Sequence, residues 1–298
     1  MGLALMATYL ARWGWLFDLA THFQVHIVIT LLAIALLFLM TRQWPLAAVT
    51  LLASLIGFSS LAPFYFGSKG VGAAQGDDVY RALALNVHYH NDAYDELLAF
   101  VAETDPDIIV LSEMTPTWQD ALQVLTVTYP YTHDIGFRGN SRVIYSRLPF
   151  VDGGMGRVAD EGRPSAVAVI DFGEAQMTVI GVHLRPPLSP ARTVQRNRQI
   201  DNLAHFAQAE TGPIMLMGDF NITPWSSVFR DFLGQAGLKD ARLGYGLAPT
   251  WPTHWPVGGI PIDHILVSPD IVIHNFQRGP HVGSDHYPIM VDFSLQTE

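Results

Sequence analysis

Hydrophobic and polar positions divide the 298-residue chain into two unlike parts. Two long apolar stretches near the N-terminus, residues 23–40 and residues 46–66, contain no charged side chain. About 20 apolar residues are needed to cross the roughly 30 Å hydrocarbon core of a bilayer. The pattern therefore predicts a helical hairpin that crosses a membrane twice, with Trp44 of the short turn at the level of the lipid headgroups. The alternative is a pair of buried helices in a soluble core.

The segments on either side of this hairpin complete the first part of the chain. Residues 3–20 are apolar but are interrupted by one arginine and one aspartate, which favours a helix lying in the membrane interface over a third span. Residues 67–78 are small, polar and glycine-rich, as is typical of a flexible linker. We therefore expect a membrane segment over residues 1–66 and a catalytic domain over residues 79–298.

After the linker, short apolar runs alternate with segments of helical pattern. The runs predict buried strands. They lie at residues 80–85, 108–111, 142–145, 166–170, 177–182, 214–217, 262–267, 271–276 and 288–293. One helix is predicted over residues 93–101, and Ser189 followed by Pro190 is typical of the start of a second, longer helix. Many strands with interspersed helices predict a single α/β or α+β domain.

Six of the predicted strands end in, or follow, polar residues that a hydrophobic core would not select. These residues are Asn86, Glu113, His183, Asp219 with Asn221, Asp263, and Asp285 with His286. Because residues just past the strand ends of an open α/β sheet tend to line the ligand crevice, we expect one shared site. Carboxylate and amide oxygens suit a hard cation such as Mg²⁺ or Mn²⁺, while imidazoles and amide N–H groups suit phosphate oxygens. The set indicates metal-assisted cleavage of a phosphate ester.

Composition and charge exclude several other classes of protein. The chain has no cysteine, so a disulfide framework, a thiolate metal site and a cysteine nucleophile are excluded. Neither the glycine-rich phosphate loop of NTPases nor the G-x-S-x-G elbow of serine hydrolases is present. A formal net charge of −10 disfavours tight nonspecific binding to nucleic acid.

Six short motifs carry a family resemblance. LALNV, IIVLSEM, VIGVHL, GDFN at 218–221, IDHILVS at 262–268 and GSDHYPI at 283–289 follow one another along the chain. Together they resemble the endonuclease/exonuclease/phosphatase superfamily, whose fold is similar to that of DNase I. The wider context, GDFNITPW after HLRPPLSP and RNRQ, resembles its bacterial members with an N-terminal membrane segment. The resemblance implies a four-layered α/β sandwich, preceded here by the transmembrane helical hairpin. GDFN followed by SDHxP is its most specific part.

The resemblance also implies a role for each residue that matches a family motif. Glu113 resembles the principal Mg²⁺ ligand, with Asn86 and Asp285 nearby. Asp219 resembles the residue that orients or deprotonates the attacking water, and Asn221 resembles the residue that holds this water or the phosphate. The identity of the base and the number of metal ions stay open.

The two histidines of the motifs have roles in the same scheme. His183 and His286 resemble the pair that stabilises the pentacovalent phosphorane. Asp263 resembles the carboxylate that orients His286 and keeps it protonated. His264, which follows Asp263 and points to the opposite face of the same strand, is interpreted as structural.

Residues that contact the substrate are harder to identify. Arg185 and Trp225 are candidates for substrate binding, and for Trp225 the alternative is a place in the core. Arg192 and Arg196 share one helix face and could hold a second phosphate or a headgroup, or could simply face solvent. The proline-rich loop at residues 251–255 carries two tryptophans that could stack on bases, enter the membrane interface or join the core.

These features predict a membrane-anchored, Mg²⁺-dependent phosphodiesterase that acts on a lipid headgroup or another membrane-proximal phosphate ester. The alternative is a membrane-anchored nuclease for DNA or RNA, which the acidic domain disfavours. A binding module without catalysis is disfavoured because all eight motif positions are filled. Arg42 in the hairpin turn and the absence of cysteine favour a bacterial inner membrane, with the catalytic domain on its extracytoplasmic side. No protein partner is predicted.

Overall fold

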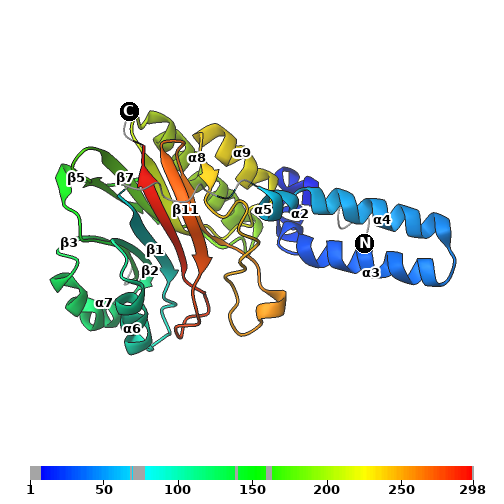
Figure 1. Cartoon of the computed structure of the whole chain (residues 1–298), viewed down its shortest axis with the longest axis horizontal. Coiled ribbons are helices and arrows are strands. Elements are labelled where there is room, and N and C mark those ends of the chain that lie inside the picture. The colour runs from blue at the N-terminus through cyan, green and yellow to red at the C-terminus, as the bar shows by residue number, and fades with distance from the viewer. Residues whose placement is uncertain (1–7, 68, 70–77, 138–139, 159–162, 297–298) are drawn as a thin grey trace.

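The computed structural model describes residues 8–67, 69, 78–137, 140–158 and 163–296 (Figure 1). The N-terminal part consists of η1 (Ala11–Trp13), α2 (Trp15–Thr21), α3 (Gln24–Met40), α4 (Trp44–Ser59) and α5 (Ala62–Phe66). The later helices are α6 (Tyr94–Thr104), α7 (Pro116–Ala121), η2 (Leu122–Val127), α8 (Pro190–Ala209), α9 (Ser227–Ala236) and η3 (Pro256–Gly258). Most of the predicted linker, residues 68 and 70–77, lies outside the described residues.

Twelve described strands form two sheets of six strands each. The first sheet has the order β11-β12-β1-β2-β4-β3, and the second has the order β5-β6-β7-β8-β10-β9. Their bounds are β1 (Tyr80–Asn86), β2 (Ile108–Met114), β3 (Tyr131–Phe137), β4 (Asn140–Ser146), β5 (Phe150–Val158), β6 (Ser165–Asp171), β7 (Gln176–His183), β8 (Ile214–Asp219), β9 (Lys239–Asp240), β10 (Asp263–Val267), β11 (Ile271–Arg278) and β12 (Ile289–Leu295). Both sheets are mixed, because β1–β2 and β7–β8 pair in parallel and the other pairs are antiparallel.

Three hydrophobic clusters hold these sheets in four layers. The cluster between the sheets joins inward side chains of both, for example Val110 of β2 and Val179 of β7. The outer face of the first sheet packs against α6, α7 and η2, and the outer face of the second packs against α8 and α9. Strands buried on both faces read as continuous apolar runs, which is why the sequence pattern found them. The predicted four-layered α/β sandwich is therefore confirmed.

The register of the strands brings the polar strand ends to one edge of the sandwich. In the parallel pair β7–β8, His183 lies opposite Asp219, and in the antiparallel pair β8–β10 Asp219 lies opposite Asp263. In the first sheet, the parallel pairing of β1 with β2 sets Asn86 opposite Ser112, the residue before Glu113. These pairings gather side chains from distant parts of the sequence at one place.

Glu113 reaches this edge through a local irregularity of β2. The register with β4 shifts between Ser112 and Met114, and Glu113 between them has a φ of 63°. Such a bulge turns one side chain away from the regular alternation of a strand. The left-handed backbone is disfavoured for a residue with a Cβ, as is common where a site dictates the geometry.

The N-terminal helices form a projecting hairpin and a base that contacts the sandwich. In Figure 1 the antiparallel helices α3 and α4 extend away from the two sheets, while α2 and α5 lie beside them. The predicted second apolar stretch, residues 46–66, is interrupted, since α4 ends at Ser59 and α5 begins at Ala62. Among the described residues, no single helix is both long enough and apolar enough to cross a membrane. Helices α2 and α3 taken together have the necessary length and composition, but they are bent by 68° relative to each other. The transmembrane hairpin and its domain boundary stay predictions.

Candidate active site

The eight polar residues at the predicted strand ends lie together at one edge of the sandwich. Asn86 connects the two sheets, because its Nδ2 donates to Glu113 Oε1 at 3.3 Å and to Asp219 Oδ2 at 3.1 Å. Its Oδ1 accepts from the backbone N–H of His88 at 3.0 Å. Asn86 in this orientation therefore links the two carboxylates through its NH₂ group and does not turn its oxygen toward them.

Glu113 and Asp285 supply the two more accessible carboxylates. His88 lies between them, with its Nδ1 at 3.3 Å from Asp285 Oδ1 and 3.9 Å from Glu113 Oε2. The backbone N–H of Tyr89 also donates to Glu113 Oε2 at 3.1 Å. The indole Nε1 of Trp251 donates to Asp285 Oδ2 at 3.0 Å, so the loop at residues 251–255 forms one rim of the site.

Asp219 occupies the buried centre. The backbone N–H of Asn221 donates to its Oδ1 at 2.9 Å, and Asn221 Nδ2 donates to its Oδ2 at 3.0 Å. Burial raises the pKa of Asp219 to about 7, against the opposing effect of the positive charge of His286. A carboxyl group with this pKa can exchange a proton at neutral pH.

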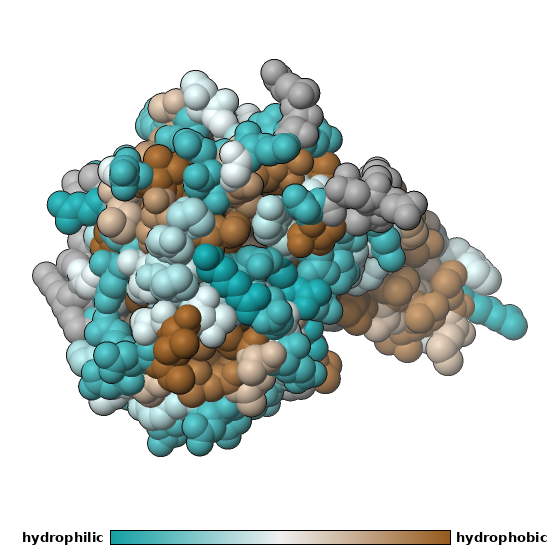
Figure 2. All heavy atoms as spheres, turned by 60° about the vertical axis from the view of Figure 1, so that its left-hand side comes forward, coloured by the Kyte–Doolittle hydropathy of each residue, from teal (hydrophilic) through white to brown (hydrophobic). Residues whose placement is uncertain are grey.

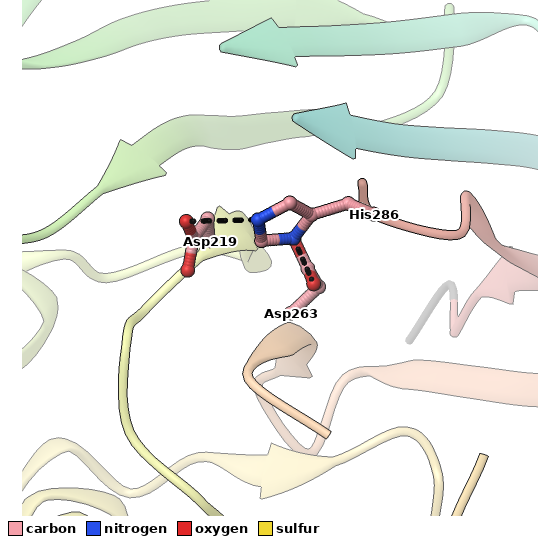
Figure 3. A group of neighbouring side chains, drawn as sticks. All are labelled: Asp219, Asp263 and His286. Atoms are coloured by element: carbon pink, nitrogen blue, oxygen red, sulfur yellow. Dashed lines mark hydrogen bonds and ion pairs between the residues drawn. The ribbon is translucent and has the colours of Figure 1, made fainter. Parts of the chain in front are cut away.

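Asp263 and His286 form a hydrogen-bonded pair beside Asp219. Figure 3 shows the imidazole of His286 between the two carboxylates, with Nδ1 at 2.8 Å from Asp263 Oδ2 and Nε2 at 3.9 Å from Asp219 Oδ2. Burial alone would lower the pKa of His286, but the charge and hydrogen bond of Asp263, with the charges of Asp219 and Asp285, raise it to about 10. His286 is therefore a cation at neutral pH, held in place by Asp263.

His183, in contrast to His286, is neutral. Its Nε2 lies 3.5 Å from Glu113 Oε1 and 3.7 Å from Asp219 Oδ2. Burial, followed by the positive charges of Arg142, Arg163 and His286, lowers the pKa of His183 well below its usual value. The site thus holds one neutral and one cationic imidazole.

The predicted residues did not include Arg163 or His88. Arg163 Nη1 lies 3.2 Å from His183 Nε2, the ring nitrogen that also lies near Glu113 and Asp219. Arg163 was hard to detect in the sequence, because it lies between β5 and β6 and next to no other site residue. His88 was closer to detection, since it follows Asn86 by two positions.

The carboxylates fit a divalent cation. Asp285 Oδ1 accepts no hydrogen bond in the described part of the chain, and the imidazoles of His88 and His286 lie 3.3 Å and 4.0 Å from it. A carboxylate oxygen of this kind suits a divalent cation. Ligand atoms of Asp219, Asp263 and His286 also lie within 4.8 Å of one another. Because His286 Nδ1 is already bonded to Asp263, the side of the site with Glu113 and Asp285 is better suited to a cation.

Several predicted residues have structural positions instead. Trp225 is 1% exposed, contacts Val28 and Phe64 of the N-terminal helices, and donates from Nε1 to Thr21 O at 2.5 Å. The prediction that Trp225 binds substrate is therefore wrong, because its indole has no face open to the site. Arg196 is also buried, in an ion pair described below, and does not offer a phosphate subsite.

Two further predictions have different outcomes. His264 is buried, with Nε2 at 2.8 Å from Ile222 O and its ring against Phe229, which confirms its structural role. Arg185 follows His183 by two residues and is half-buried, with its backbone N–H donating to Gln199 Oε1 at 2.9 Å. Its binding to substrate stays a prediction.

Two mixed sheets packed face to face, with carboxylates, amides and imidazoles converging at one edge, define a metal-dependent hydrolase of phosphate esters. The comparison with family models agrees with this class. The model of the Endonuclease/Exonuclease/phosphatase family matches residues 83–286, and the chain therefore belongs to this family.

Solved structures share the fold at low sequence identity. TDP2 of D. rerio in complex with a single-strand DNA product is 18% identical, with a TM-score of 0.63 over 73% of this chain and 100% of its own. The endonuclease/exonuclease/phosphatase of Bacteroides vulgatus is 17% identical, with a TM-score of 0.62 over 74% of this chain and 100% of its own. No curated protein matches the sequence.

Proposed function

We propose that this enzyme hydrolyses a phosphodiester with the help of Mg²⁺ or Mn²⁺ while its N-terminal hairpin anchors it in a membrane. The substrate is a lipid headgroup or another phosphate ester close to the bilayer. The observation that carries the membrane anchor is the large apolar surface that the N-terminal helices expose.

The N-terminal helices bury several polar side chains beside apolar ones and expose many large apolar side chains. Asp18, Thr21, His22 and Gln24 are buried, whereas Trp13 is 77% exposed and Leu16 is 66% exposed. Along α3 and α4 the exposed large apolar side chains are Ile29, Leu32, Leu36, Leu37, Leu39, Met40, Trp44, Leu46, Val49, Leu51, Leu52, Leu55 and Ile56. Figure 2 shows hydrophobic side chains over the projecting hairpin. Exposed apolar area on this scale is stabilised by a lipid environment and not by water.

The turn of the hairpin supports an inserted position. Thr41, Arg42 and Gln43 are polar and exposed at the end farthest from the sandwich. A charged turn is costly inside hydrocarbon but is stable among headgroups. The 17 residues of α3 are about 26 Å long at 1.5 Å per residue, slightly less than the roughly 30 Å of a typical bilayer core. A membrane adapts to such a difference by local thinning.

One rim of the active site contacts the base of the hairpin. The ring of Trp255 stacks on His26 of α3, with centroids 6.2 Å apart and planes 22° apart, and the same loop reaches Asp285 through Trp251. The active site therefore opens close to the plane in which the hairpin would enter a membrane. This position favours a substrate held at the membrane surface.

The residues of the site divide the chemistry among them. A bound divalent cation would offset the negative charge of the phosphate and polarise its P–O bonds. Asp219, with its pKa near 7, accepts a proton from the attacking water, and Asn221 keeps the Asp219 carboxylate in place. The imidazolium of His286 donates to a phosphate oxygen as negative charge develops, as Asp263 fixes its orientation.

The test compares one enzyme on two kinds of substrate. The full chain is reconstituted in liposomes that contain a phospholipid, and release of a headgroup or phosphate product is measured beside hydrolysis of a short single-stranded DNA at the same salt concentration. We expect the lipid to be cleaved faster per enzyme. DNA or RNA turnover orders of magnitude above that of every lipid would contradict a lipid substrate.

A nuclease is the second candidate. It is favoured by the shared fold with the TDP2 structure that contains a single-strand DNA product. The net charge of −10 opposes it, because binding a nucleic-acid backbone relies on neutralising its phosphates. An extracytoplasmic catalytic domain in a bacterial inner membrane stays a prediction.

A further inference from the structure

An ion pair is buried between the N-terminal helices and the sandwich, and it contacts the loop after β8 that carries Asn221. Arg196 of α8 and Asp18 of α2 approach at 2.9 Å between Nη2 and Oδ2, and at most 1% of either side chain is exposed. Ser226 Oγ donates to the second carboxylate oxygen of Asp18 at 3.4 Å. Breaking a buried pair from one side leaves an uncompensated charge, so the two residues depend on each other.

Arg196 continues from this pair to the loop that follows β8. Its Nη1 donates to the backbone carbonyl of Asn221 at 3.5 Å, and its Nε donates to Asn197 Oδ1 at 3.2 Å. On the other side of the same residue, the amide of Asn221 donates to Asp219 and to Leu184 O at 3.1 Å. Arg196 and Asp219 therefore contact opposite ends of Asn221.

The backbone of Asn221 is left-handed, with a φ of 51°, a conformation that asparagine adopts more readily than most residues. Its orientation is set by the hydrogen bonds at its carbonyl, its backbone N–H and its side-chain amide. The α2 helix also contacts the rest of this loop, with Thr21 Oγ1 at 3.5 Å from Thr223 Oγ1 and Thr21 O accepting from Trp225 Nε1. The loop at residues 220–226 is thus held from behind by the N-terminal helices.

We propose that Asp18 and Arg196 are positioning residues, which hold Asn221 and through it the carboxylate of Asp219 in the geometry that hydrolysis requires. The N-terminal helices then form the back wall of the active site in addition to any contact with a membrane. Asp18 acts in this way whether the substrate is a lipid or a nucleic acid.

The test uses the full chain in detergent micelles with a small soluble phosphodiester. Asp18→Asn removes one charge at nearly constant volume. We expect kcat to fall roughly 10- to 100-fold, the range associated with a displacement of about 1 Å. KM and the Mg²⁺ concentration for half-maximal activity should not change, because Glu113 and Asp285 are held by other contacts.

A double variant separates positioning from stability. Asp18→Asn with Arg196→Met removes both charges, and replacing a buried pair by neutral side chains is often close to neutral for folding. We expect the double variant to regain the thermal stability of the natural chain but to keep a low kcat. If the double variant recovered both its stability and its kcat, the proposal would be overturned. This comparison remains decisive even if Asp18→Asn alone does not fold.

The matched control is an exposed ion pair between the same two parts. Arg12 and Asp231 lie 3.2 Å apart with side chains that are 58% and 49% exposed, and neither residue takes part in the hydrogen bonds of Asn221 given above. Arg12→Ala should leave kcat within about two-fold, since exposed pairs contribute little. If the Asp18→Asn variant is folded and its kcat also stays within about two-fold of the natural chain, a positioning role is excluded.

Discussion

Helices α3 and α6 differ in the side chains that they expose. In α6, Leu97 and Phe100 are buried against the first sheet, while Asp95 and Glu96 are exposed. In α3, Gln24 is buried and its Nε2 donates to Gly57 O of α4 at 3.1 Å, while Leu36 is 53% exposed. The catalytic sandwich exposes charged side chains, as is usual in water, whereas the hairpin exposes apolar side chains, as expected of helices that would lie in lipid.

The contact between these two regions combines an apolar cluster around Trp225 with buried polar pairs. Asp18 with Arg196, and Thr21 with Trp225 and Thr223, connect the base of the hairpin to the loop behind Asp219. An apolar contact alone would leave the relative placement of the two regions loosely defined, whereas directional hydrogen bonds fix it. The two regions expose different kinds of side chain, but these contacts hold them together.

The largest expected effect concerns the sandwich alone. Removing divalent cations with EDTA should abolish hydrolysis of a soluble phosphodiester, and Mg²⁺ or Mn²⁺ should restore it, because Glu113 and Asp285 need a cation to act on phosphate. The unfolding temperature and the attachment to vesicles should change little. Activity that persists after complete chelation would show that these carboxylates have another role.

A smaller effect is expected on pH dependence. The pKa of His286 is raised to about 10, so its imidazolium persists below this pH and is lost above it. Asp263→Asn removes the main cause of the increase, so the alkaline limb of the kcat profile should move to lower pH, with a loss of roughly 10²-fold in rate. A large loss of rate with an unmoved alkaline limb would mean that Asp263 acts by another route.

A matched pair of substitutions tests the contrast in burial directly. Leu97→Ala in α6 should lower the free energy of unfolding by roughly 2–5 kcal/mol, because it opens a cavity in a packed core. Leu36→Ala in α3 should change it by less than about 0.5 kcal/mol in detergent, since nothing packs tightly over its exposed side. Chemical denaturation of both variants gives the two values. Equal losses would indicate that a protein surface covers the hairpin.

The smallest effect is expected at the rim between the two regions. Trp255 is 56% exposed and stacks on His26 without contacting a carboxylate, unlike Trp251, which bonds Asp285. Trp255→Ala should lower the rate on a liposome-bound substrate several-fold, because local concentration at the surface falls. The rate on a soluble phosphodiester serves as the reference and should be unchanged. A parallel loss on both substrates would place Trp255 in the catalytic machinery.

Much of the fold and site could be predicted from patterns that depend on neighbours in sequence. The apolar runs of β1, β2, β7 and β8 were evident because strands buried on both faces need continuous hydrophobic residues. By contrast, β3 and β5 were missed, since β5 carries exposed and half-buried residues and glycines that resemble a loop. The polar ends at Asn86, Glu113 and His183 were recognised because a core excludes such side chains.

The sequence by itself determined the family, the sandwich and the inventory of carboxylates, amides and imidazoles. Only the tertiary structure decided that Trp225 and Arg196 face the N-terminal helices and that Arg163 and His88 join the site. Their environment is set by partners 20 or more residues away in the chain, which no local pattern contains. The charge states of His183 and His286 differ for the same reason, because burial and neighbouring charges set a pKa, and both depend on how the strands and loops are assembled.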